Sequence, residues 1–277
     1  MPKNKQKGYL SEYAYIKTNK KNKTSVKKLP HKLFLISITL IALFILVFFA
    51  NIFAGLITPG RINLNRGDRY LQERNVYAVE LANFDNIGQA NEASLTYKQQ
   101  LAAGYVINDK GTYRVLASLY QSRVNAESVI QNLKESEVDA SLFNIKLPVL
   151  YMDLNLAAEQ KESLKKSLEL WYDTYVNIYN ISLALDKSEK TIAQCEIELL
   201  NLKTACEIKI NDFYEKVSEP KNTQVIYTKI YLNMLQDRLS ELIGTDTTST
   251  LYSSKLKEGY FRIIYDYLGL LTELAKN

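Results

Sequence analysis

The spacing of apolar residues changes twice along the chain and divides it into three regions. Residues 33–57 form one continuous apolar run without a charge. Between residues 76 and 147, apolar and polar residues alternate in short runs typical of strands, and helical runs separate them. After residue 149, apolar residues recur three and four positions apart, as in helices that pack together. The pattern predicts a membrane-spanning helix, then an α+β domain, then an all-α domain.

The α+β region contains one strand pattern twice, YAVELANF at residues 77–84 and YRVLASLY at residues 113–120. Each copy starts with Tyr, has Val two positions later and ends on an aromatic ring. An alanine of the next helical run, Ala90 or Ala126, follows that ring by six residues. The repeat predicts two similar halves, each with a strand and a helix.

The segments around the two copies complete a β-α-β-β-α-β order. Helical runs are predicted at residues 90–103, ending at a glycine, and at 124–134. Short strands are predicted at 105–107 and 138–145, and residues 108–111 have the composition of a hairpin turn. Two such halves form a four-stranded antiparallel sheet with both helices on one face. This arrangement leaves the other face open to solvent or a ligand.

Residues 76–147 resemble the SPOR domain family over their whole length. In that family the first strand reads like YxVQVGxF and the third like YRVxVGPF, and the repeated pattern is similar to both. The resemblance implies a domain that binds peptidoglycan, favouring glycan strands stripped of their stem peptides, which accumulate at division septa. It also implies that the open sheet face holds the sugar chain. The positions carried over to that face are Glu80, Asn83, Phe84, Arg114 and Leu116.

Four positions depart from the family pattern. Glu80 stands where the family usually has Gln, and a carboxylate accepts hydrogen bonds but cannot donate them. Ala82 and Ser118 replace glycines, and Leu119 replaces a proline. These differences leave two alternatives, a domain that binds glycan and a SPOR-like spacer that has lost this binding.

The same topology occurs in RNA-recognition domains, which stack bases on aromatic residues of the sheet. Residues 76–147 hold six basic and eight acidic side chains. A net negative surface is unfavourable for phosphate binding. The sequence therefore predicts no nucleic-acid partner.

The C-terminal region, 149–277, carries four apolar stripes at helical spacing. The stripes are Leu164, Leu168, Trp171, Tyr175 and Ile178; Ile192, Cys195, Leu199, Leu202 and Cys206; Leu232, Leu235, Leu239 and Leu242; and Leu256, Tyr260, Ile263, Tyr267, Leu270 and Leu274. Breaks at Pro220 and residues 244–246 predict three or four helices in an antiparallel bundle. Residues 186–189 are either a turn with Asp186 as N-cap or a stutter in one long helix. The tyrosines of the stripes are predicted as core, with a ligand groove as the alternative.

The basic charge of the chain lies mostly in its N-terminal tail. Residues 1–32 hold ten lysines and one acidic residue, so the remainder holds 25 basic and 29 acidic residues. The 25 uncharged residues 33–57 exceed the roughly 20 that span a bilayer and the roughly 7–15 of a signal-peptide core, the alternative considered. The positive-inside rule places the Lys-rich tail in the cytoplasm of a bacterium and residues 58–277 outside, with 58–75 as a stalk.

The composition excludes several kinds of catalytic site. His31 is the one histidine, so the predicted outer region has neither a Ser-His-Asp triad nor a His-ligated zinc site. No metal or other cofactor is predicted. Cys195 and Cys206 lie 11 residues apart, about 16 Å along a helix, which is too far for a mutual disulfide. They are predicted as small buried residues, with a bridge between two chains as the alternative.

Three functions fit this sequence. The first is a membrane-anchored, non-catalytic peptidoglycan-binding protein of the division or sporulation septum, whose helical bundle binds a protein partner. The second is a scaffold that binds such a partner through the bundle without touching glycan. The third is a cell-wall hydrolase targeted by its SPOR-like part, and the lack of histidine in the predicted outer region argues against it.

Overall fold

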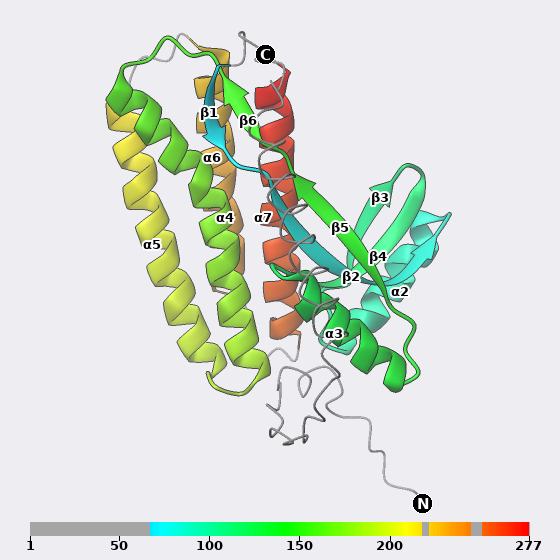
Figure 1. Ribbon diagram of the computed structural model, residues 1–277. Helices are drawn as coiled ribbons and strands as arrows, with labels where there is room; N and C mark the ends of the chain where they lie inside the picture. Colours follow the sequence, from blue (N-terminus) through cyan, green and yellow to red (C-terminus); the bar gives the residue numbers. More distant parts are fainter. Residues whose placement is uncertain (1–66, 218–221, 245–250, 277) are drawn as a thin grey trace, which may run out of the picture. The chain divides into compact units, whose positions relative to one another are not determined.

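The computed structural model describes residues 67–217, 222–244 and 251–276 (Figure 1). The predicted tail, the predicted membrane helix and residues 58–66 of the predicted stalk lie outside the described residues. Among the helices that are described, none combines the length and the hydropathy needed to cross a bilayer.

The α+β region has the predicted element order and forms a four-stranded antiparallel sheet with the strand order β3-β4-β2-β5. Its elements are β2 (Arg74–Phe84), α2 (Ile87–Gln99), β3 (Tyr105–Asp109), β4 (Thr112–Tyr120), α3 (Arg123–Glu135) and β5 (Ser141–Leu147). Helix α2 starts earlier than predicted because the Asn86 side chain caps it by accepting a bond from the Gly88 amide. It also ends earlier than the predicted residue 103, and Leu101 beyond it takes a left-handed φ of 68°.

The two copies of the repeated pattern pair with each other in the centre of the sheet. Tyr77 lies opposite Tyr120, and Phe84 lies opposite Tyr113, so the start of each copy meets the end of the other. The register shifts on both sides of Glu80. The repeat therefore produces an approximately symmetric pair of strands that is interrupted at one position.

The hairpin between β3 and β4 follows the chemistry that the sequence predicts. Lys110 and Gly111 both have positive φ, 54° and 96°, as two-residue hairpin loops require. The Asn108 carboxamide oxygen accepts a hydrogen bond from the Gly111 amide at 2.8 Å. This turn sets the register that places Ile107 opposite Arg114.

Part of the predicted stalk is instead a strand. Strand β1 (Asp68–Leu71) pairs with β6 (Leu150–Met152) in a separate two-stranded sheet. Tyr70 and Leu71 are buried, so the chain enters the core before residue 76. The segment was predicted as a stalk because residues 58–75 are polar and contain Pro59, Gly60 and Gly67. A strand of four residues is too short to show a clear alternation of apolar and polar positions.

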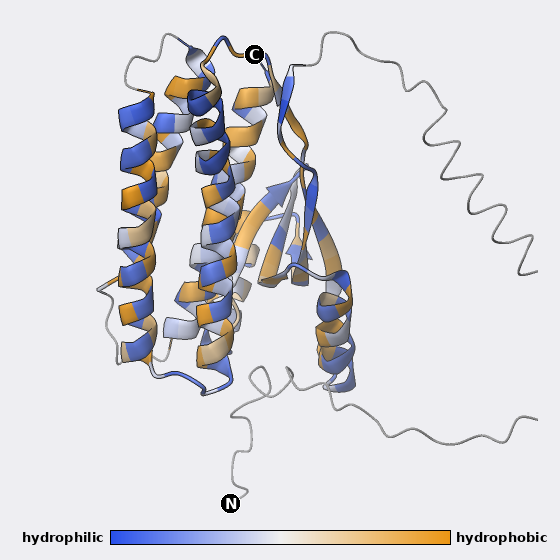
Figure 2. Ribbon diagram, turned by 60° about the vertical axis from the view of Figure 1, so that its left-hand side comes forward, coloured by the Kyte–Doolittle hydropathy of each residue, from blue (hydrophilic) through white to orange (hydrophobic). Residues whose placement is uncertain are grey.

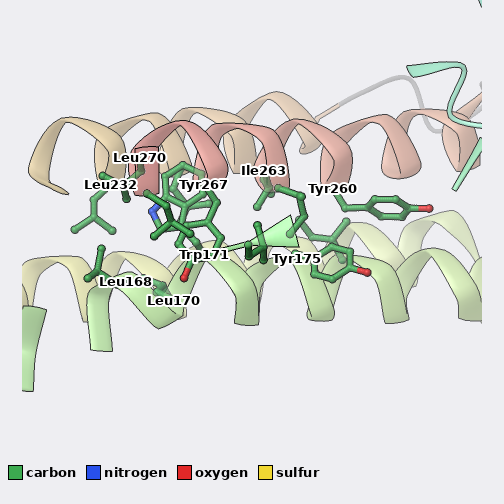
Figure 3. Packing of buried hydrophobic residues seen from close by; sticks show 14 of the residues in the cluster. Leu168, Leu170, Trp171, Tyr175, Leu232, Tyr260, Ile263, Tyr267 and Leu270 are labelled. Carbon is green, nitrogen blue, oxygen red and sulfur yellow. The ribbon is translucent and has the colours of Figure 1, made fainter. Parts of the chain in front are cut away.

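The C-terminal region is described as four helices, and Figure 1 shows consecutive ones running in opposite directions. They are α4 (Ala158–Asp186), α5 (Ile192–Lys216), α6 (Thr223–Leu242) and α7 (Tyr252–Ala275). The predicted stripes of α4, α6 and α7 are buried throughout, and Trp171 stacks on Tyr267 between α4 and α7 (Figure 3). Residues 187–191 are a turn, but the N-cap of α5 is Thr191, whereas Asp186 ends α4.

The second face of the sheet is not open, contrary to the prediction. Val76, Ala78 and Leu116 on this face belong to the same hydrophobic core as the bundle helices. Figure 1 shows α7 between the sheet and the rest of the bundle, and Figure 2 shows apolar residues on the strands beside it. Helices α2 and α3 cover the other face with a second, smaller core. Helices therefore cover most of both faces of the sheet.

Candidate functional site

Three of the five predicted site residues meet at the end of the sheet. The Arg114 guanidinium donates from Nη1 to the Glu80 carboxylate at 2.8 Å. The Asn83 amide nitrogen donates to the other oxygen of the same carboxylate, also at 2.8 Å. Both oxygens of Glu80 thus have a partner, which offsets the cost of burying a polar group.

The register shifts around Glu80 bring Asn83 to this cluster. Successive side chains in a regular strand point to opposite faces, so residues three apart lie on different faces. Leu81 has no residue opposite it in β4, and this extra residue restores Asn83 to the face of Glu80. The bulge therefore gives the sheet two polar side chains where a regular strand would give one.

Arg114 is held by a second carboxylate and an aromatic ring. Its Nε donates to Asp109 at 2.8 Å, and its guanidinium lies 5.1 Å from the centre of the Phe143 ring. The hydrogen bond to Glu80, followed by the one to Asp109, raises the pKa of Arg114 although burial opposes this. The guanidinium and two carboxylates carry a net charge of about −1 between them.

The remaining predicted residues do not join the cluster in the same way. Leu116 is completely buried under the bundle, with an exposed fraction of 0%. Phe84 is half-buried at the end of β2, opposite Tyr113. Leu116 is therefore a core residue in this structure, and it offers no surface to a ligand.

Helix α7 covers the part of the sheet face around Leu116. The Tyr260 hydroxyl lies 2.6 Å from the Ser118 hydroxyl, and burial raises the pKa of Tyr260, which keeps it protonated. The Phe261 ring stacks on Tyr105 of β3 at 5.1 Å, with 10° between the ring planes. Lys257 donates to the Leu101 carbonyl oxygen at 2.8 Å. Rings and hydrogen bonds together fix α7 on the sheet.

What remains of this face is here named the uncovered strip. It consists of Asn83, Asp109, Arg114 and Phe143, together with the buried Glu80 that holds Asn83 and Arg114. Asp109 and Phe143 were not predicted. Asp109 was within reach of sequence reasoning, since the hairpin turn fixes the register of β3 and β4 and places it diagonally to Arg114. Phe143 was not, because the pairing of β2 with β5 joins residues far apart in the chain.

The uncovered strip has the chemistry of a binding surface. It offers amide and guanidinium donors, carboxylate acceptors and a ring edge. Among the residues that the structure describes, no group of three or more His, Cys, Asp or Glu could hold a metal ion.

Comparison with known proteins gives one match. Residues 73–143 match the SPOR domain family, and this segment contains all five predicted site residues. SPOR domains are peptidoglycan-binding domains linked to cell division, and they are typically non-catalytic. No curated protein and no solved structure gives a significant match to the chain. Helices α4 to α7 lie outside the matched segment.

Proposed function

We propose that this chain is a non-catalytic, membrane-anchored protein that binds glycan strands of peptidoglycan at the division or sporulation septum. The match of residues 73–143 to a peptidoglycan-binding family carries the proposal. The uncharged residues 33–57, preceded by the Lys-rich tail, support an anchor that places residues 58–277 outside the cytoplasm.

The uncovered strip is the surface through which this chain binds glycan. A sugar chain presents hydroxyl and N-acetyl groups for hydrogen bonding and C–H faces for rings. Asn83 is exposed and can both donate and accept, and Arg114 has five N–H donors of which the carboxylates engage two. The buried carboxylate of Glu80, at a position where the family usually has Gln, orients both side chains.

The covered part of the face does not take part in binding. Tyr260, Phe261, Leu116 and Leu119 are each at most 1% exposed, and exposing a large apolar side chain costs about 1.5–3 kcal/mol. Lifting α7 would therefore cost about 6–12 kcal/mol. A ligand of micromolar affinity has about 8 kcal/mol in total. A glycan that binds at the strip with α7 in place avoids this cost, so its full binding free energy appears as affinity.

The test is sedimentation of the purified full-length chain, in detergent, with insoluble peptidoglycan sacculi. Sacculi treated with an amidase, which removes stem peptides, are compared with untreated ones. We expect binding that rises after amidase treatment, and we expect Asn83→Ala to weaken it. The matched control is Asn91→Ala, which changes an exposed amide on α2. A folded chain that sediments with neither kind of sacculus would contradict the proposal.

A second function is favoured by one observation. The bundle buries most of the face that the family resemblance assigns to glycan, including Leu116. A scaffold that recruits a division or sporulation protein through its helices has no need of that face. Failure of the folded chain to bind sacculi, together with capture of a septal protein by the same chain, would support the scaffold.

A further inference from the structure

The edge of the uncovered strip is formed by a residue of the bundle. Tyr265 of α7 lies one helical turn after Phe261, and its ring is 5.5 Å from the ring of Tyr105, tilted by 34°. Phe261 and Tyr265 thus both contact Tyr105, the first inside the core and the second at its border. Phe261 is fully buried, whereas Tyr265 is only partly buried.

Tyr265 is also close to the charged groups of the strip. Burial raises the pKa of Tyr265, and the charges of Asp109 and Arg114 act on it as well. Arg114 lies 5.1 Å from the centre of the Phe143 ring, and Tyr265 contacts Tyr105 on the neighbouring strand β3. Asn83 and the strip carboxylates supply hydrogen-bonding groups between these aromatic residues.

We infer that Tyr265 is a specificity-determining residue of the glycan site, which is thus built jointly by the SPOR region and the bundle. This inference rests on the proposed function. Its ligand is an uncharged sugar ring, an N-acetylhexosamine unit, whose C–H face covers an aromatic residue while its amide meets Asn83 or Arg114. The net charge of about −1 on the guanidinium and carboxylates disfavours an anionic group at the same point.

The experiment compares four full-length chains on amidase-treated sacculi: the unaltered chain, Tyr265→Leu, Tyr265→Phe and Tyr227→Ala. Leu keeps apolar volume in contact with Tyr105 but removes the ring, and Phe keeps the ring but removes the hydroxyl. Tyr227 is a partly buried tyrosine of α6 and serves as the control for general loss of packing. Thermal unfolding of each variant is recorded in parallel.

We expect Tyr265→Leu to weaken binding about tenfold or more, because an aromatic ring that covers a sugar face carries much of the binding energy of such a contact. Tyr265→Phe should stay within about twofold of the unaltered chain, and Tyr227→Ala should bind normally. Normal binding by Tyr265→Leu would overturn the inference while leaving the proposed function intact. An unaltered chain that is folded but does not bind would instead overturn the proposed function.

Discussion

Helices cover most of both faces of the sheet, but the two faces are closed in different ways. Helices α2 and α3 close one face from within the repeat, and small residues allow their close approach: Ala90 and Ala126 on the helices and Ala117 on β4 are all buried. Helix α7 closes the other face from far along the chain, since Ser118 and Tyr260 are 142 residues apart.

The chemistry of the two faces differs as well. The α2/α3 face is packed mainly with alanines and aliphatic side chains, whereas the α7 face adds stacked rings, a hydroxyl pair and a lysine that donates to the Leu101 carbonyl. The first face is covered by helices α2 and α3, which belong to the same repeated halves as the strands. The second closes only when the bundle is present, so the sheet and the bundle share one core and are expected to fold together.

Removing the bundle should have the largest effect on stability, because it uncovers one face of the sheet and leaves the other face closed. In a fragment of residues 67–153, Val76, Leu116 and Leu119 on the α7 face would become exposed to water. Exposing each of these side chains costs about 1.5–3 kcal/mol of folding free energy. Total stabilities of domains are only about 5–15 kcal/mol. We expect no cooperative thermal transition of this fragment by circular dichroism, in contrast to residues 67–277. A cooperative transition of the short fragment would show that the faces are independent.

The next largest loss of stability is expected from truncating one large side chain on each face. Phe261→Ala on α7 is expected to lower the free energy of unfolding by about 3–5 kcal/mol, and Leu133→Ala on α3 by about 2–4 kcal/mol. Urea unfolding is followed by circular dichroism and by fluorescence of Trp171, the single tryptophan. Both signals should shift together in both variants. A Leu133→Ala shift in circular dichroism alone would mean that the two regions unfold separately.

The buried lysine of α7 connects three segments. Its removal should therefore lower the free energy of unfolding about as much as the truncations on the two faces do. Lys257 pairs with Asp186 at 2.7 Å, with side chains 9% and 14% exposed, and also donates to Leu101. Lys257→Ala leaves the mostly buried Asp186 carboxylate without its cation, and we expect the free energy of unfolding to fall by about 3 kcal/mol. Lys161→Ala, which breaks the exposed pair with Asp68, is the control and should cost less than about 1 kcal/mol. Equal effects in urea unfolding would contradict the buried role.

The pair of hydroxyls between Tyr260 and Ser118 should contribute less to the free energy of unfolding than the aromatic rings do. Tyr260→Phe and Ser118→Ala each remove one partner of a 2.6 Å hydrogen bond and are expected to cost about 1 kcal/mol. The double variant should cost less than the sum of the two, because the second change removes a group already left without its partner. Additive costs in urea unfolding would show that the hydroxyls are not coupled.

The smallest expected effect concerns the two cysteines, whose labelling by a thiol reagent reports accessibility and not stability. Burial raises the pKa of both the Cys195 and the Cys206 thiols, which lowers the fraction of reactive thiolate. A thiol reagent at about pH 8 should label them slowly in the native chain and rapidly in denaturant. Fast native labelling, or a dimer lost on reduction, would favour the bridge between two chains.

Much of the local structure follows from the sequence. The βαββαβ order, the hairpin at residues 108–111 and the buried stripes of α4, α6 and α7 all come from short-range patterns, and the structure has them. Such patterns are reliable because turn residues and helical spacing act within a few residues. The prediction of an open face came from the topology, however, which places both helices of the two halves on one face of the sheet.

The sequence did contain a signal for the covered face. Residues 76–79 of β2 and 115–117 of β4 are consecutive apolar residues, which is typical of strands buried on both faces. In α7, Tyr260, Phe261, Ile263 and Ile264 spread over about 160° of the helix surface, which is wider than a single apolar stripe. Both patterns show that each element needs two partners, but neither says which partner.

The sequence by itself determined the elements of this protein and the kind of residue on each of their sides. The tertiary structure alone decided that α7 lies on the sheet, that Leu116 is core, and that Glu80, Asn83 and Arg114 remain at a narrow strip beside it. The physical reason is that burial of apolar surface has no direction and no preferred partner. Which faces meet depends on all the elements packing at once, over separations that local patterns do not reach.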